Sequence, residues 1–105
     1  MFSLDNYFIM EVENRSNIEN VDICEDNTHI GYEPRVDLVL KEPGKPSIER
    51  LVGTLSGKAA VYPFKKGDLV AVSINFRGYK YAGEFVNHIR IDDIKLVKEL
   101  DYLYL

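Results

Sequence analysis

The chain has 105 residues, of which 46% are hydrophobic and 29% charged, and its formal net charge is −4. This length fits one domain over residues 1–105, and the composition argues against a disordered chain and against a membrane protein. The sequence does not open with a basic and then apolar leader, and Cys24 is its single cysteine. We therefore expect a cytoplasmic protein without an intrachain disulfide.

Alternation of apolar and polar residues predicts β-strands in the first half of the chain. Three strands are expected over residues 7–12, 35–41 and 48–55. Glu42-Pro-Gly-Lys-Pro46 predicts a turn before the third strand, because Pro fixes φ and Gly supplies a positive φ. Residues 14–34 would form an unusually long loop unless Val21–Cys24 extends the first strand or pairs with it.

The second half of the chain predicts a short helical insert followed by two more strands. The helical turn is expected over residues 58–62, and the strands over residues 68–77 and 84–91. Pro63 ends the helix, and a hairpin tip with two glycines, residues 77–83, joins the strands. The apolar parity slips by one after Ile91, which predicts a β-bulge at Asp92-Asp93.

Three strands, a small helical insert and two further strands are the element order of the OB-fold. We therefore predict an all-β protein: a five-stranded OB-fold Greek-key barrel with a short helical insert between strands 3 and 4. A half-open sandwich or an SH3-like barrel is the structural alternative, and periodicity does not separate these architectures.

Charge is distributed unevenly along the chain. Residues 1–34 carry one basic and eight acidic side chains, residues 35–91 carry ten basic and five acidic, and residues 92–105 carry two and four. The basic middle segment is consistent with a polyanionic partner, whereas the overall charge is not. The alternative interpretation is that these cations decorate a solvated sheet face.

Two segments resemble known proteins. Glu49-Arg-Leu-Val-Gly-Thr-Leu-Ser-Gly-Lys-Ala-Ala60 resembles the strand-and-helix junction of single-stranded DNA-binding proteins. Residues 66–91 resemble a family of short bacterial proteins of unknown function in the OB-fold, single-stranded-DNA-binding-protein-like group. The residues that fit its pattern are Gly67, Asp68, Val70, Val72, Arg77, Gly78, Tyr81, Gly83, Phe85, Asn87 and Arg90.

The resemblance spans about residues 49–97 and implies non-enzymatic, sequence-independent binding of single-stranded DNA. Such proteins use cations to track phosphates and flat rings to stack bases. We expect phosphates to lie against Arg35, Lys41, Arg50, Arg77, Lys80 and Arg90, and bases to stack on Tyr79 and Tyr81. The alternative is that both tyrosines only stiffen a hairpin through cross-strand pairs.

The sequence departs from that resemblance at both ends. The N-terminal third is more acidic than the resemblance implies, and the chain ends Lys98-Glu-Leu-Asp-Tyr-Leu-Tyr-Leu105 instead of in a long flexible tail. We expect Leu100–Leu105 to pack on the barrel or to form the contact of a homo-oligomer. The rival function is a protein-interaction or structural module that uses both ends and does not bind nucleic acid.

No catalytic or metal-binding pattern stands out. Gly53-Thr-Leu-Ser-Gly-Lys-Ala59 is one residue short of a P-loop, and Ala59 stands where a hydroxyl residue would bind magnesium. One cysteine and two histidines cannot supply a structural zinc site. We therefore expect a protein that is not an enzyme and that needs neither a cofactor nor a metal.

Overall fold

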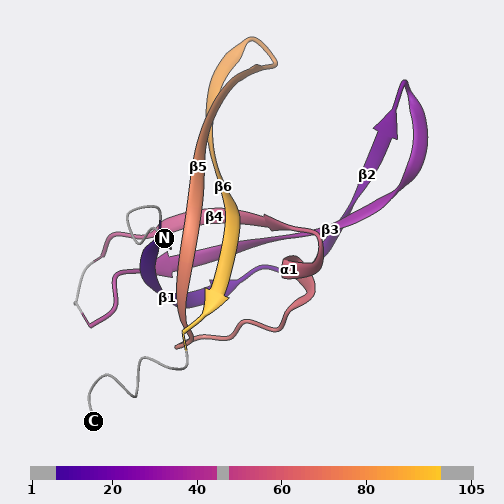
Figure 1. Ribbon diagram of the computed structural model, residues 1–105. Helices are drawn as coiled ribbons and strands as arrows, with labels where there is room; N and C mark the ends of the chain where they lie inside the picture. Colours follow the sequence, from indigo (N-terminus) through magenta and orange to yellow (C-terminus); the bar gives the residue numbers. More distant parts are fainter. Residues whose placement is uncertain (1–6, 45–47, 98–105) are drawn as a thin grey trace, which may run out of the picture.

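The structure is a computed structural model that describes residues 7–44 and 48–97. Its regular elements are strands and one short helix: β1 (Phe8–Arg15), β2 (Glu19–Glu25), β3 (Thr28–Lys41), β4 (Leu51–Ser56), α1 (Lys58–Val61), β5 (Leu69–Tyr81) and β6 (Glu84–Leu96). The expected all-β class is confirmed (Figure 1). Helix α1, at four residues, is too short to cross a membrane, and the described residues hold no other helix.

The strands form one sheet in the order β1-β5-β6-β4-β3-β2, and an additional pairing joins β1 to β3. Five strands are therefore bonded in a ring, with β2 attached to its outside. Neighbouring ring strands are antiparallel except β4 and β6, which are parallel. In the described chain, β4 and β6 pair at one position, Thr54 with Arg90. The ring therefore has the fewest backbone hydrogen bonds between these two strands.

The hydrophobic core lies inside this ring. Strand alternation turns every second side chain inward, as the sequence predicts for β3 and for the start of β5. The core contains Val12, Val36, Leu38, Leu40, Leu55, Ala60, Phe64, Val70, Val72 and Ile91. Complete burial of an aliphatic side chain contributes about 1.5–3 kcal/mol, so these residues supply most of the driving force for folding.

The sequence-based strand count was one too low. Residues 14–34 are not a long loop, because β2 forms a hairpin with β3 instead of pairing with β1. Its turn is made by Asp26 and Asn27, whose φ angles are 51° and 62°. Asp and Asn tolerate this left-handed conformation, which a two-residue hairpin turn requires. The next strand, β4, begins at Leu51, three residues later than expected.

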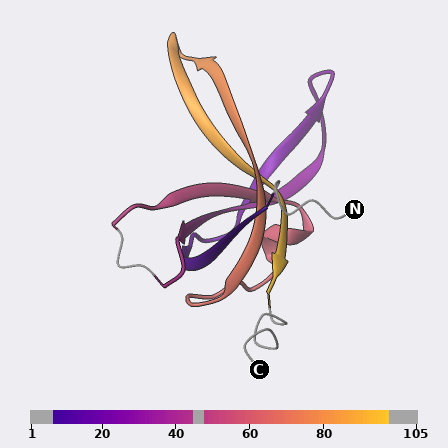
Figure 2. The ribbon, with the colours of Figure 1, turned by 60° about the vertical axis from the view of Figure 1, so that its left-hand side comes forward.

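Two hairpins extend beyond the ring. The β2–β3 arm comprises residues 19–34, and the β5–β6 arm comprises residues 75–90. The second arm is longer than expected, since its strands stay paired through Tyr81 and its turn lies at Ala82-Gly83. Figures 1 and 2 show that both arms project from the same side of the ring and diverge, which makes the molecule elongated, 55 × 32 × 28 Å.

The expected bulge is confirmed at the base of the β5–β6 arm. Ser73 pairs with Asp93 while Ile74 pairs with Ile91, so Asp92 is the extra residue. The shift keeps Ile91 and Ile94 directed at the core from both sides of the bulge. The helical insert is also where the sequence places it, and Tyr62 leaves the helix with an extended backbone before Pro63.

Candidate functional site

A cleft of about 870 Å³ opens where the two arms leave the ring. A smaller hollow adjoins it, and the two share Arg35, Thr54, Arg77, Gly78 and His88. We call the combined surface the interarm cleft. Its lining comes from four strands: Arg35 and Asp37 of β3, Val52, Thr54 and Ser56 of β4, Phe76, Arg77, Gly78 and Tyr79 of β5, and Asn87, His88, Ile89 and Arg90 of β6.

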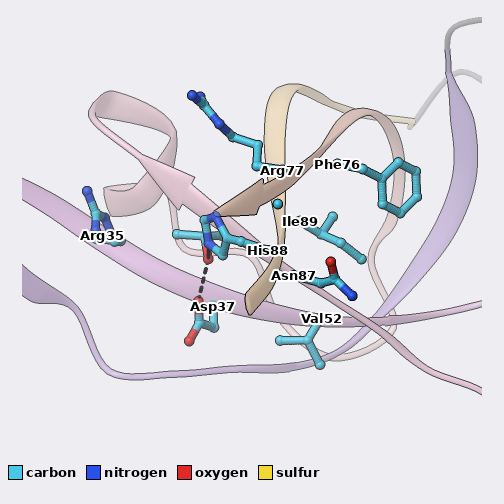
Figure 3. A pocket seen from close by; sticks show the side chains of 10 residues that line it. Arg35, Asp37, Val52, Phe76, Arg77, Asn87, His88 and Ile89 are labelled. Carbon is cyan, nitrogen blue, oxygen red and sulfur yellow. Dashed lines mark hydrogen bonds between the residues drawn. The ribbon is translucent and has the colours of Figure 1, made fainter. Parts of the chain in front are cut away.

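Strand alternation explains why polar side chains face this cleft. Arg35, Asp37 and Thr54 have the opposite parity to the core residues Val36, Leu38 and Leu55. On β6, His88 and Arg90 alternate in the same way with the buried Ile91. The outer face of β3, β4 and β6 therefore forms the floor, and the base of the β5–β6 arm forms a wall (Figure 3).

Three guanidinium groups surround the cleft. Arg35 and Arg77 are exposed, and neither forms an ion pair with any described residue. Arg90 donates from Nε to the Asp92 carboxylate over 2.8 Å, which leaves its terminal nitrogens available. Arg35 and Arg77 therefore give the site positive charge that no described side chain neutralises.

Among the described residues that line the cleft, Asp37 is the one carboxylate, and it is already hydrogen-bonded. The Thr54 hydroxyl donates to Asp37 Oδ1 over 2.8 Å, and its oxygen lies 2.9 Å from His88 Nε2. A hydroxyl has one hydrogen, so His88 Nε2 carries the proton of the second bond and donates it to Thr54. This chain joins β3, β4 and β6 where the ring has its fewest backbone bonds, and it fixes the imidazole at the cleft floor.

Aromatic side chains stand beside the cations. Tyr79 lines the cleft, and its ring lies edge-on to His88 with centroids 6.5 Å apart. Phe76 is 72% exposed and lies at the end of the cleft away from Arg35 (Figure 3). Flat rings next to cations are the side chains on which unpaired bases stack.

Of the eight residues named from the sequence, four come together in the cleft: Arg35, Arg77, Tyr79 and Arg90. Tyr81 shares a face with Tyr79 but lies at the arm's tip, 69% exposed. Lys80 points to the other face of the arm, where its Nζ lies 5.8 Å from the centre of the Phe85 ring.

Lys41 and Arg50 lie outside the interarm cleft, and both are paired. Lys41 Nζ is 3.5 Å from Glu11, its partner across the strands, and Arg50 holds Glu13 with two guanidinium nitrogens. The hydrogen bonds from Arg50 lower the pKa of Glu13 and raise that of the guanidinium. Their charge is therefore largely satisfied within the protein, and neither adds to the positive potential of the cleft.

The Glu13–Arg50 pair predicts a small acid-dependent loss of stability. A carboxyl group whose pKa is lowered by folding stabilises the native state above its ordinary value of 4.5, and this contribution is lost as pH falls through the lowered value. We expect Arg50→Ala to reduce the melting temperature at pH 6 and to have less effect at pH 3. Thermal melts followed by circular dichroism test this, and an equal reduction at both pH values would contradict it.

The sequence missed the polar chain under the cleft and the role of Phe76. Asp37 and Thr54 are opposite each other only in the β3–β4 register, and His88 reaches them from another hairpin. Phe76 has the parity of the core residues Val70 and Val72, but the arm carries it beyond the ring, where it is exposed. The predicted contact through Leu100–Leu105 lies outside the described residues.

The comparisons add no relative. No protein-family model, no curated protein and no solved structure matches this chain. Within residues 7–44 and 48–97, no group of three or more His, Cys, Asp or Glu side chains is placed to hold a metal ion.

Proposed function

We propose that this protein is a small OB-fold that binds single-stranded nucleic acid, DNA in the first instance, without strong sequence preference and without catalysis. Three consecutive ring strands, β1, β3 and β4, are antiparallel neighbours, and β5 returns after α1 to lie beside β1. This is a Greek-key arrangement. With β6 between β5 and β4, and with the helix after the third ring strand, it supports the OB-fold assignment.

The position of the cleft supports the same proposal. In OB-folds, the second and third barrel strands and the loops after the first and fourth strands form the usual surface for oligonucleotides. Here β3 and β4 supply the cleft floor, and the two arms occupy the places of those loops. The unusual length of the arms would enlarge that surface.

The observation that carries the proposal is the pair of guanidinium groups, Arg35 and Arg77, which face one cleft without a carboxylate partner among the described residues. A cation held in this way gains an ion pair only when an anionic ligand arrives. Phosphates would lie against these arginines and Arg90, and bases would stack on Tyr79 and Phe76. A single OB-fold covers about 4–16 nucleotides.

Removing the ring of Tyr79 tests the stacking part of the proposal. Base stacking contributes about 1–3 kcal/mol per base, so Tyr79→Ala should weaken oligo-dT binding roughly 5- to 150-fold. Because no cation is removed, the dependence of log K on log salt should keep its slope. Fluorescence anisotropy with labelled oligo-dT across a salt series measures both quantities.

Tyr79→Phe is the matched control, since it keeps the ring and should keep most of the affinity. Equal binding by wild type and Tyr79→Ala would remove this tyrosine from the site. Tyr81→Ala, whose ring lies farther along the same face, should have a smaller effect than Tyr79→Ala.

The second candidate function is a protein-interaction module that ignores nucleic acid. It is favoured by Phe85, which is 87% exposed on the face of the β5–β6 arm that does not carry Arg77. The same anisotropy experiment decides between the two functions. Absence of oligo-dT binding even at low salt would favour the interaction module. The first proposal also includes membership of the bacterial family named above and a cytoplasmic location.

A further inference from the structure

The two arms carry opposite charges. The β2–β3 arm has five carboxylates and neither Lys nor Arg over residues 19–34. The β5–β6 arm has three cations, Arg77, Lys80 and Arg90, and a single carboxylate, Glu84. One molecule therefore presents an acidic ribbon and a basic ribbon from the same side of its ring (Figure 2).

Part of the charge of each arm lies on the face that turns toward the cleft. Glu19 is the cross-strand partner of Arg35, which lines the cleft, so the two share a face. Alternation along β2 places Glu25 on that face, and the pairing of Val21 with Glu33 adds another carboxylate. On the other arm, Arg77 lines the cleft directly.

The two arms of one molecule do not neutralise each other. They diverge from the ring in both views, and no described carboxylate of the β2–β3 arm forms an ion pair with a described cation of the β5–β6 arm (Figures 1 and 2). Within the acidic arm, Asp22 Oδ1 lies 2.9 Å from His29 Nδ1. Complementary charge is thus available to another molecule.

Each arm also has an unpaired backbone edge. Strand β2 ends the sheet and is bonded to β3 alone, and β6 is bonded only to β5 over residues 84–89 in the part of the chain described. Such edges hydrogen-bond readily to a further strand. The β6 edge carries Glu84 and neither Lys nor Arg over residues 84–89, so the positive charge of this arm comes from Arg77 and Lys80 on the adjacent β5 and from Arg90 at its base. An acidic arm and a basic arm with free edges of similar length fit each other better than either fits itself.

We propose that the occupant of the interarm cleft in the free protein is the β2–β3 arm of a second copy of this chain. The β2 edge of one copy lies along the β6 edge of its partner, and the carboxylates at Glu25 and Glu33 lie opposite the cations of the partner's β5–β6 arm. A reciprocal exchange about a twofold axis closes the pair as a dimer. Because the exchange covers the cleft, dimer and polynucleotide exclude each other, but dimer formation itself does not depend on nucleic-acid binding.

Sedimentation of the full chain without nucleic acid tests this, using two charge-reversal variants that lie wholly within the arms. The variants are Arg77→Glu with Lys80→Glu, and Glu25→Lys with Glu33→Lys. On the faces that turn toward the cleft, the first variant makes both arms acidic and the second makes both arms basic, so the dissociation constant of each should rise at least about tenfold over wild type. An equimolar mixture should associate again, because each arm then meets an opposite one.

The matched control is Lys58→Glu with Lys65→Glu, which changes the net charge equally at exposed positions away from the arms and should leave the dimer unchanged. Wild-type association should also weaken as salt rises from 50 to 500 mM. Circular dichroism verifies folding, and Arg77→Gln and Glu33→Gln replace any reversal that unfolds the chain.

A wild type that stays monomeric at low salt and high concentration overturns the proposal. So does a dimer that neither reversal weakens, or a mixture of variants that stays monomeric. Failure of oligo-dT to bind, with the dimer and its charge dependence intact, would refute only the proposed nucleic-acid function.

Discussion

Replacing Arg35 and Arg77 together by alanine is expected to weaken oligo-dT binding more than any other pair of changes in the cleft. Each phosphate contact to a single strand contributes about 0.7 to the slope of log K against log salt, so loss of two contacts lowers the slope's magnitude by about 1.4. If their contribution vanishes near 1 M salt, affinity falls roughly 60-fold at 50 mM and roughly 10-fold at 200 mM. Anisotropy titrations at four or more salt concentrations give both the affinities and the slope.

Two double variants separate the cleft from simple net charge. Lys58→Ala with Lys65→Ala removes the same charge from exposed positions outside the cleft, and we expect an unchanged slope. Lys41→Ala with Arg50→Ala removes two cations named from the sequence that are paired with Glu11 and Glu13. If either control reduces affinity as much as the Arg35 and Arg77 pair, binding follows overall charge and the cleft is not the site.

The distinction between these cations shows how far sequence reasoning reaches. Alternation in a strand tells which side chains share a face, and by this parity Arg35 and Lys41 lie on one face of β3. Alternation does not tell which side chains of other strands lie next to that face. Strand β1 brings Glu11 to within 3.5 Å of Lys41 Nζ, whereas Glu19 of β2, the cross-strand neighbour of Arg35, forms no ion pair with it. The pairing depends on register between distant segments, which periodicity does not contain.

The arms show a second limit. Where a strand extends beyond the core, its apolar residues still alternate with polar ones, but the apolar side chains are no longer buried. Phe76 therefore has the sequence pattern of a core residue and is largely exposed. No residue of β2 is fully buried, and only Val21 and Ile23 are partly buried, so its short alternation does not mark a core strand. The signal that could have identified the arm is Asp26-Asn27, because two adjacent residues that tolerate positive φ favour a hairpin turn. The ring strands and the bulge, in contrast, follow from apolar parity, because there the core imposes it.

Substitution of Gly53 is the other change with a large expected effect, because Gly53 lies on β4, where β4 and β6 close the ring through few backbone pairs. A Cβ built on Gly53 would lie 2.7 Å from Cγ1 and 2.9 Å from Cδ1 of Ile91, a core residue of β6. The Ile91 side chain therefore fills the space that a residue with a side chain would occupy. It fastens β6 to β4 beside the single Thr54–Arg90 pairing.

Gly53→Ala should destabilise the protein by about 1–3 kcal/mol, because Ile91 must move within a packed core. Gly78→Ala is the matched control: its backbone is also ordinary for an L-residue, and a Cβ there meets only Asn87 Oδ1, at 3.8 Å. That change should be nearly neutral. Urea unfolding curves give the free energies, with the m-value checking that each variant unfolds from the same native state.

A double-mutant cycle decides whether the contact with Ile91 is the cause. Ile91→Ala alone should cost about 2–5 kcal/mol for the cavity that it leaves. In that background the methyl group added by Gly53→Ala enters free space, so its further cost should fall close to zero. If Gly53→Ala costs the same with and without Ile91, the strain lies in the backbone of β4, and closure of the ring does not depend on this contact. If the cost disappears, the glycine is required because the Ile91 side chain occupies the space beside it, between β4 and β6.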